Sequence, residues 1–272
     1  MDERARQIVR DALVEDAAFE DVTTLATVPA GARGRARCVA RTACVIAGLE
    51  LFEAAFLEMD AKVRVNVLVA DGACLSPDSV VAEVEGSLRA ILSAERTALN
   101  FVQRLSGIAT LTAQYVAAAG GVQVRDTRKT TPGWRALEKA AVRAGGGTNH
   151  RSTLAEAVLI KDNHIVAAGG LGPAVAAAKA AATWVEVECD TLAQVREALD
   201  AGADELLLDN MDVRTLSEAV EIVAGRARTE ASGGVTLETI GAIARTGVDA
   251  ISVGALTHSA PAADLSLEVE EI

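Results

Sequence analysis

The sequence predicts an α/β protein whose two regions have different strand patterns. In residues 62–72, valines alternate with other residues, as in a half-buried antiparallel strand that ends in an Asp-Gly turn. After Gly121, short unbroken apolar runs alternate with alanine-rich helical stretches, as in parallel strands covered by helices. We therefore expect a small antiparallel sheet with helices, followed by a series of βα units.

The N-terminal region contains the elements of the antiparallel sheet. Residues 1–17 form an amphipathic helical pattern, with the apolar residues spaced for one face. Residues 79–86 read as a further strand, and residues 35–48 as one or two more. A long helical segment starts near Ala94, with Gly107 as a candidate interruption.

The C-terminal region contains about six βα units. Its apolar runs cover residues 122–127, 157–163, 184–189, 205–210, 228–234 and 250–255. Helical stretches lie between most of them, at residues 171–182, 191–201, 212–224 and 235–246. This spacing is typical of a βα-barrel or of an open doubly wound sheet, and it falls short of a full eight-stranded barrel.

Composition excludes several classes of protein. The net charge of −12 and the low aromatic content argue against nucleic acid or an anionic membrane as the partner. No apolar run approaches the ~20 residues of a membrane span, and the N-terminal stretch is too charged for a signal peptide. The four cysteines lack a CxxC spacing and fit reduced thiols in the cytoplasm, and the presence of only three histidines argues against a His/Cys zinc site.

Polar or glycine residues follow the apolar runs at their carboxyl ends, where parallel α/β folds place their active sites. These residues are Asp126-Thr127-Arg128-Lys129, Lys161-Asp162-Asn163-His164, Glu186 and Glu188, Asp209-Asn210, Ser232-Gly233-Gly234, and Gly254. Residues 125–161 also hold eight cations and three acids, in a chain that is otherwise strongly acidic. A solvated basic face would explain such a cluster, but cations beside strand ends and glycines favour an anion site.

The strand-end residues form three chemical groups. Arginine and lysine recognise carboxylates and phosphates, and this group comprises Arg128, Lys129, Arg151 and Lys161, with His150. Glu188 and Asp209 form a carboxylate pair suited to Mg²⁺, to sugar hydroxyls or to a developing positive charge. Backbone N–H groups near the glycines offer a phosphate seat at residues 232–234 and 253–255. Together they predict a ligand that carries carboxylates, phosphates and a sugar.

These motifs resemble the quinolinate phosphoribosyltransferase family, also called nicotinate-nucleotide pyrophosphorylase (carboxylating). The resemblance is carried by DTRKTTPGWR, AVRAGGGTNHR, LIKDNH, EVE, LLLDN, EASGG and SVGALTHS, in this order, with AERTALNFVQRLSGIAT and DVTT before them. It implies an N-terminal α/β sandwich domain over residues 1–105, joined by the tail 257–272, and an incomplete α/β barrel over residues 106–256. It also implies a dimer, and the cysteines predict that it is cytoplasmic.

The resemblance further implies the reaction and its residues. Quinolinate and phosphoribosyl pyrophosphate would give nicotinate mononucleotide, pyrophosphate and CO₂, with Mg²⁺ near Glu188 and Asp209. Lys129, Lys161, Glu188 and Asp209 are the expected catalytic residues. The expected substrate-binding residues are Arg96 (reaching into the partner's site), Arg128, Lys129, Thr130, His150, Arg151, Lys161, Glu188, Asp209, Ser232, Gly233, Gly234, Val253, Gly254 and Ala255.

Three alternatives stay open at this point. A nicotinate phosphoribosyltransferase would use a monocarboxylate, whereas the number of cations favours a diacid. Lys161 at a strand end is also where a Schiff-base aldolase would carry its lysine. Residues 71–86 faintly resemble a biotinyl or lipoyl carrier, but no lysine lies at a suitable hairpin tip.

Overall fold

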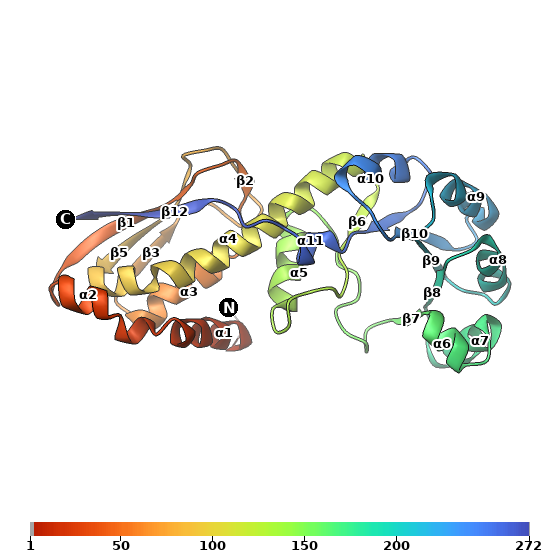
Figure 1. Ribbon diagram of the computed structural model, residues 1–272, viewed down its shortest axis with the longest axis horizontal. Helices are drawn as coiled ribbons and strands as arrows, with labels where there is room; N and C mark the ends of the chain where they lie inside the picture. The colour runs from red at the N-terminus through yellow and green to blue at the C-terminus, as the bar shows by residue number, and fades with distance from the viewer. Residues whose placement is uncertain (1–2, 272) are drawn as a thin grey trace. The chain divides into compact units, whose positions relative to one another are not determined.

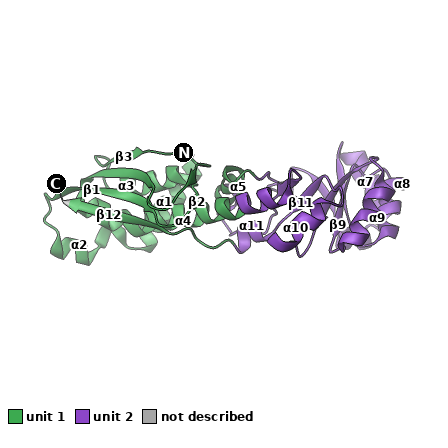
Figure 2. Ribbon diagram, turned by 90° about the horizontal axis from the view of Figure 1, so that it is seen from above, with its two compact units in different colours: residues 1–111, 137–146, 260–272 green, residues 112–136, 147–259 purple. Residues whose placement is uncertain are grey.

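The structure is a computed structural model that describes residues 3–271. The chain divides into two compact units, shown in green and purple in Figure 2. Unit 1 comprises the described residues up to Leu111, Leu137–Gly146, and those from Ala260 on; unit 2 comprises Thr112–Ala136 and Gly147–Ser259. Residues 137–146 therefore group with unit 1, whereas the sequence prediction placed them in the C-terminal domain.

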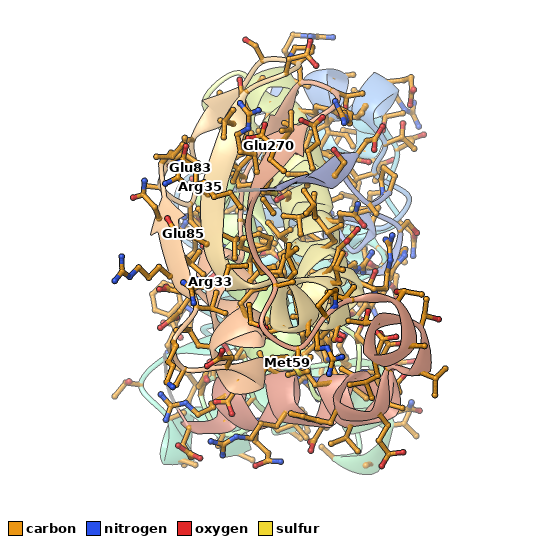
Figure 3. All side chains as sticks on the ribbon, turned by 90° about the vertical axis from the view of Figure 1, so that its left-hand side faces the viewer. Arg33, Arg35, Met59, Glu83, Glu85 and Glu270 are labelled. Carbon is orange, nitrogen blue, oxygen red and sulfur yellow. The ribbon has the colours of Figure 1, made fainter. Side chains whose placement is uncertain are left out.

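Unit 1 is built on a four-stranded antiparallel sheet with the order β12-β1-β5-β3 (Figure 1). The strands are β1 (Arg33–Ala40), β3 (Arg64–Val67), β5 (Val80–Ser87) and β12 (Leu265–Glu271). The tail expected to join this domain contributes β12, which pairs with β1. Along β1, small buried residues alternate with arginines, so that one face packs inward and Arg35 pairs with Glu85 on the other (Figure 3).

Helices and a short ladder complete unit 1. They are α1 (Glu3–Glu15), the 3₁₀ helix η1 (Ala18–Glu20), α2 (Val22–Thr27), α3 (Leu49–Met59), α5 (Arg135–Ala144, nearly all in this unit), and the ladder of β2 (Cys44–Val45) with β4 (Cys74–Leu75). The predicted strand 62–72 is wrong in length, because only Arg64–Val67 pairs with β5. Its valines do not share a buried face, since Val63 is buried and Val67 is exposed. Asp71 instead accepts N–H bonds from Gly48 and Leu49 at the start of α3.

Helix α4 (Leu88–Ala119) is one unbroken helix of 32 residues. It begins six residues before the predicted start at Ala94, and Gly107 does not interrupt it. A Cβ atom at Gly107 would overlap the carbonyl oxygen of Pro261. This glycine is therefore explained by the close approach of the chain that leads to β12, and not by a break in the helix.

Unit 2 is built on a six-stranded parallel sheet with the order β6-β11-β10-β9-β8-β7. The strands are β6 (Gln123–Arg125), β7 (Val158–Ile160), β8 (Val185–Cys189), β9 (Glu205–Asp209), β10 (Arg228–Ser232) and β11 (Ala250–Ser252). From β7 to β11, consecutive strands are neighbours, and β6 then pairs with β11. This is the strand order of a βα-barrel with an open seam between β6 and β7 in the described chain.

The helices of unit 2 lie between these strands along the chain (Figure 1). They are α6 (Asp162–Ala167), α7 (Leu171–Ala181), α8 (Leu192–Asp200), α9 (Val213–Val223), α10 (Leu237–Ala244) and α11 (Ala255–His258). Val187, Leu206 and Ile251 are fully buried in the sheet, as expected for strands covered by helices. Within residues 3–271, no helix combines the length and apolar character needed to cross a bilayer.

Candidate active site

A cavity of about 400 Å³ lies at the carboxyl ends of the strands of unit 2. Its lining residues are Asp126, Thr127, Arg128, Lys129, His150, Arg151, Leu159, Lys161, Glu188, Leu207, Asp209, Glu230, Ser232 and Ser252. All six strands contribute a lining residue directly or through the residues that follow them. Eight of the residues predicted from the sequence thus come together around one cavity.

Three of the cavity's cations lack a carboxylate partner in the described structure. Arg128 and Lys129 follow β6, and Arg151 lies in the loop before β7. The Nε atom of Arg128 is buried and has no hydrogen-bond partner among residues 3–271. Burial and the nearby Arg128 charge lower the pKa of Arg151 below its ordinary value. Two arginines that repel each other around a buried free donor form a site for an anion.

Four carboxylate residues line the same cavity, and Glu188 and Asp209 are the two that were predicted from the sequence. Glu188 lies near the end of β8, and its carboxylate pairs with the Lys161 ammonium group. Asp209 is the last residue of the neighbouring strand β9, and Asn210 donates a 2.5 Å hydrogen bond to it. The cavity therefore presents carboxylate oxygens beside its cations, as a sugar phosphate with a bound cation would require.

The two glycine-containing loops follow β10 and β11. Gly233 has a φ of 91°, and a Cβ atom there would overlap the Asn210 side chain. Gly254 lies beside Lys129, because a Cβ atom at this position would be 3.1 Å from Lys129 Cδ. Of these loops only Ser232 lines the cavity; the other predicted members, which do not, are Gly233, Gly234, Val253, Gly254 and Ala255.

Two other predicted residues also lie off the cavity lining. Thr130 accepts a 2.9 Å hydrogen bond from Arg135 Nε, so its hydroxyl group helps to hold the loop after β6. Arg96 belongs to unit 1, where it is exposed on α4 and forms no hydrogen bond or salt bridge with the described residues.

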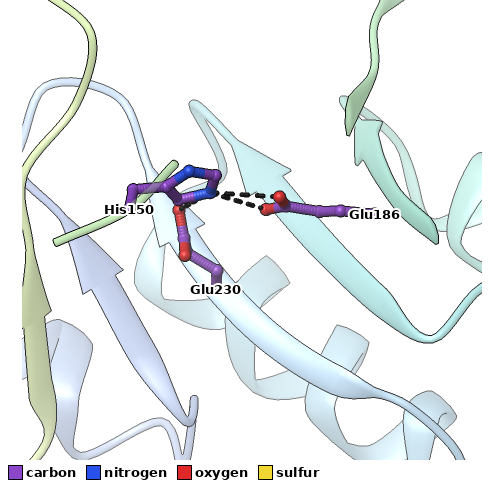
Figure 4. A group of neighbouring side chains, drawn as sticks. All are labelled: His150, Glu186 and Glu230. Atoms are coloured by element: carbon purple, nitrogen blue, oxygen red, sulfur yellow. Dashed lines mark hydrogen bonds and ion pairs between the residues drawn. The ribbon is translucent and has the colours of Figure 1, made fainter. Parts of the chain in front are cut away.

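Two buried acidic residues lie next to His150. Glu186 was predicted among the polar residues at the strand ends but was given no chemical role, and Glu230 was not singled out. Glu186 and Glu230 lie inside β8 and β10, and their side chains are 4% and 0% exposed. Both face His150, as Figure 4 shows. For Glu186 the signal was a glutamate between two valines in a buried parallel strand, a position that normally holds an apolar residue, whereas Glu230 lies between Thr229 and Ala231 and gave a weaker signal.

The charges of this buried group shift its pKa values. Burial lowers the pKa of His150, but the hydrogen bond and charge of Glu186 and the charge of Glu230 outweigh it, so the pKa is raised. Burial and the charge of Glu186 raise the pKa of Glu230. His150 and Glu230 therefore bind protons more readily than the same side chains would in water.

Family comparisons agree with the strand-end pattern. The model of the quinolinate phosphoribosyltransferase N-terminal domain matches residues 21–106, and that of the C-terminal domain matches residues 108–268. The chain belongs to the quinolinate phosphoribosyltransferase family. The resemblance inferred from the motifs is thereby confirmed, as is the α/β fold class with its small antiparallel sheet and six-stranded parallel sheet.

Relatives of this quinolinate phosphoribosyltransferase family member cover almost the whole chain. A tobacco (Nicotiana tabacum) protein named quinolinate phosphoribosyltransferase [decarboxylating] 2b is 43% identical, over 97% of this chain and 82% of the relative. A Bacillus subtilis protein named probable nicotinate-nucleotide pyrophosphorylase [carboxylating] is 44% identical over 86% of this chain and 83% of its own. The nicotinate-nucleotide pyrophosphorylase structure from Francisella tularensis has a TM-score of 0.95 at 39% identity, covering 98% of this chain and 96% of that chain.

Proposed function

We propose that this protein is an enzyme that transfers the phosphoribosyl group of phosphoribosyl pyrophosphate to quinolinate and releases CO₂, in the biosynthesis of NAD. The observation that carries this proposal is a set of cations that have no carboxylate partner among residues 3–271. These cations, Arg128, Lys129 and Arg151, surround one cavity together with Glu188 and Asp209. A dianionic acid and a sugar pyrophosphate would together supply anionic partners for these three cations. The family membership supports the same reaction.

Quinolinate binding is assigned to the arginines. The planar guanidinium groups of Arg128 and Arg151 each suit a carboxylate, and the free Nε–H of Arg128 provides a donor that awaits an acceptor. Lys129 and Lys161 lie on the same cavity and would offset the charge of the pyrophosphate. His150, which was expected to assist in binding quinolinate, lines the same cavity.

Ribose and Mg²⁺ are assigned to the acids. Glu188 and Asp209 would bind the ribose hydroxyls and hold Mg²⁺, partly through the substrate, because Mg²⁺ usually takes one or two carboxylates together with phosphates and water. Oxygen donors from neighbouring strands fit this ion, although Glu188 shares its charge with Lys161. Bound Mg²⁺ would neutralise charge on the departing pyrophosphate. Residues 232–234 and 253–255 would seat the 5′-phosphate with backbone N–H groups.

For this reaction the chain has to position the two substrates and to stabilise the charge that develops on the sugar. The ring nitrogen of quinolinate attacks the anomeric carbon, and the bond to pyrophosphate breaks with its electron pair leaving on oxygen. Glu188 and Asp209 favour the positive charge that grows on the sugar. The adjacent carboxylate then leaves as CO₂, its electron pair stays on the ring next to the quaternary nitrogen, and a proton replaces it. Clamping by Arg128 and Arg151 sets the geometry of attack.

The decisive assay follows CO₂. Quinolinate labelled in the carboxylate next to the ring nitrogen is incubated with phosphoribosyl pyrophosphate and Mg²⁺, and both labelled CO₂ and nicotinate mononucleotide are measured. We expect equal amounts of the two. Turnover of nicotinate without CO₂ would instead identify the monocarboxylate enzyme. Adduct trapping by borohydride would favour the aldolase, although Lys161 is already engaged in an ion pair with Glu188.

We further propose a homodimer in which Arg96 enters the partner's site, and a cytoplasmic location that suits four free cysteines. The first point is supported by the exposure of Arg96, which has no hydrogen bond or ion pair with any described residue and is thus available to a partner. Mixing an Arg96→Ala chain with a Lys161→Ala chain should restore part of the activity, because one of the two sites in the mixed dimer has both residues intact. Mixed dimers without recovered activity would contradict a shared site.

A further inference from the structure

We propose that Glu186 and Glu230 are positioning residues, which fix His150 and through it the loop that presents Arg151 to the substrate. In this assignment His150 links the loop to the buried acids and is not itself a ligand of quinolinate. The inference rests on the proposed function only for the identity of the substrate. The link between His150 and the two acids can be tested without it.

Both ring nitrogens of His150 are engaged inside the protein. The Nε2 atom lies 3.0 Å from Glu186 Oε2 and 3.8 Å from Glu230 Oε1 (Figure 4). The Nδ1 atom accepts a 2.8 Å hydrogen bond from the backbone N–H of Arg151. A neutral ring must therefore carry its proton on Nε2, where it is donated to the acids. This leaves neither nitrogen for a carboxylate of the substrate.

The loop that carries Arg151 depends on such anchors. Residues 149–157 form neither a helix nor a strand. The buried Asp126 accepts hydrogen bonds from the His150 N–H at 2.9 Å and from Asn149 Nδ2 at 2.6 Å. The His150 ring adds a second attachment through Glu186. Because Arg151 follows directly, the position of its guanidinium depends on these bonds.

The free-energy cost of burying Glu186 and Glu230 indicates that these acids have a functional role. Burying a carboxylate is unfavourable unless cations and donors surround it. Arg125 pairs with both Glu230 and Glu205, and Ser252 donates a 2.5 Å hydrogen bond to Glu230. An apolar residue would fill these strand positions without such compensation. His150, Glu186 and Glu230 lie close enough together to hold a metal ion, but Arg125 and His150 already supply positive charge to the two acids.

The kinetic test compares three isosteric variants. Glu186→Gln and Glu230→Gln keep the shape of the side chain and remove its charge from His150. Glu205→Gln is the matched control, because it removes a buried charge from the same Arg125 without facing the histidine. We expect the first two to raise KM for quinolinate roughly tenfold or more, since small misplacements of binding groups are costly. KM for phosphoribosyl pyrophosphate should change little, and the control should resemble the parent.

A spectroscopic test separates this inference from the function. The chain has only three histidines, so the ¹⁵N NMR signals of the His150 ring can be assigned as those that disappear in His150→Gln. Above its titration midpoint the ring should carry its proton on Nε2. The charged groups near the ring are Glu186, Glu230 and Arg125. The titration midpoint of His150 should fall in Glu186→Gln, which removes one of the two acids. It should not fall in Glu205→Gln, because this control leaves both acids in place.

The outcomes are distinct. An unchanged midpoint in Glu186→Gln, or a KM increase of equal size in the Glu205→Gln control, overturns the inference while leaving the CO₂ assay intact. If quinolinate is not the substrate, the CO₂ assay fails and the NMR result still stands. Thermal unfolding of each variant checks the fold, and should Glu230→Gln not fold, Glu186→Gln alone decides.

Discussion

Arg128 is the residue whose removal should most directly affect substrate binding. Its Nε–H is buried without a partner among the described residues, so a bound carboxylate would satisfy it. We predict that Arg128→Ala weakens quinolinate binding by about 2–5 kcal/mol, the usual cost of truncating one member of a buried charge pair. Isothermal titration calorimetry measures this loss, and circular dichroism should show an intact fold.

Two variants serve as comparisons for Arg128→Ala. Arg128→Lys keeps the charge and loses the planar fork, so its affinity should fall between the parent and the alanine variant. Arg33→Ala removes an exposed arginine from β1 and should bind quinolinate like the parent. Unchanged affinity in Arg128→Ala would refute the assignment of this arginine to the substrate.

At the residue scale, the sequence predicted the site residues at the strand ends better than the acids inside the strands. Arg128, Lys161 and Asp209 directly follow or end apolar runs, and the carboxyl ends of parallel strands meet at one edge. Glu186 and Glu230 lie inside strands, where their contacts depend on which strands become neighbours. That pairing order joins residues far apart in the chain, so local patterns did not reveal it.

Among the elements, helix α4 offers a test of close packing. Alanine normally favours a helix over glycine by about 1 kcal/mol. At Gly107 we predict the opposite: Gly107→Ala should lower the free energy of unfolding by about 1–3 kcal/mol, because its methyl group meets the Pro261 carbonyl. Chemical denaturation measures the change.

The matched control lies in helix α10. A Cβ atom at Gly241 would have its nearest contact at an ordinary 3.4 Å, to Ala118 O. Gly241→Ala should therefore be neutral or stabilising, by up to about 1 kcal/mol. Equal destabilisation by both substitutions would show that Gly107 is not special.

The elements themselves were predictable in unit 2 and less so in unit 1. Helices α7 to α10 and all six parallel strands lie within a few residues of their predicted ranges, because each unit repeats the same pattern. In unit 1 the strand predicted at residues 62–72 is shortened to β3, and the short ladder of β2 with β4 was not predicted. Antiparallel pairings between distant segments leave weaker local signals.

For the whole molecule, the four cysteines give a simple test of packing. Cys38, Cys44 and Cys189 are buried and Cys74 is exposed, all as free thiols. Burial raises the pKa of Cys38 and of Cys189 to about 12, so neither forms a thiolate near neutral pH. We predict one fast-reacting thiol with Ellman's reagent at pH 8 and four after denaturation. Cys74→Ser should abolish the fast phase, and two or more fast thiols in the parent would contradict the burial.

The pairing of β12 with β1 has a consequence for biosynthesis. During translation, β1 leaves the ribosome more than 200 residues before β12 does. Through that interval the nascent chain carries an unpaired sheet edge, which is prone to associate with other chains. Arg33, Arg35 and Arg37 on that strand supply like charges that would keep two such edges apart until the last strand arrives.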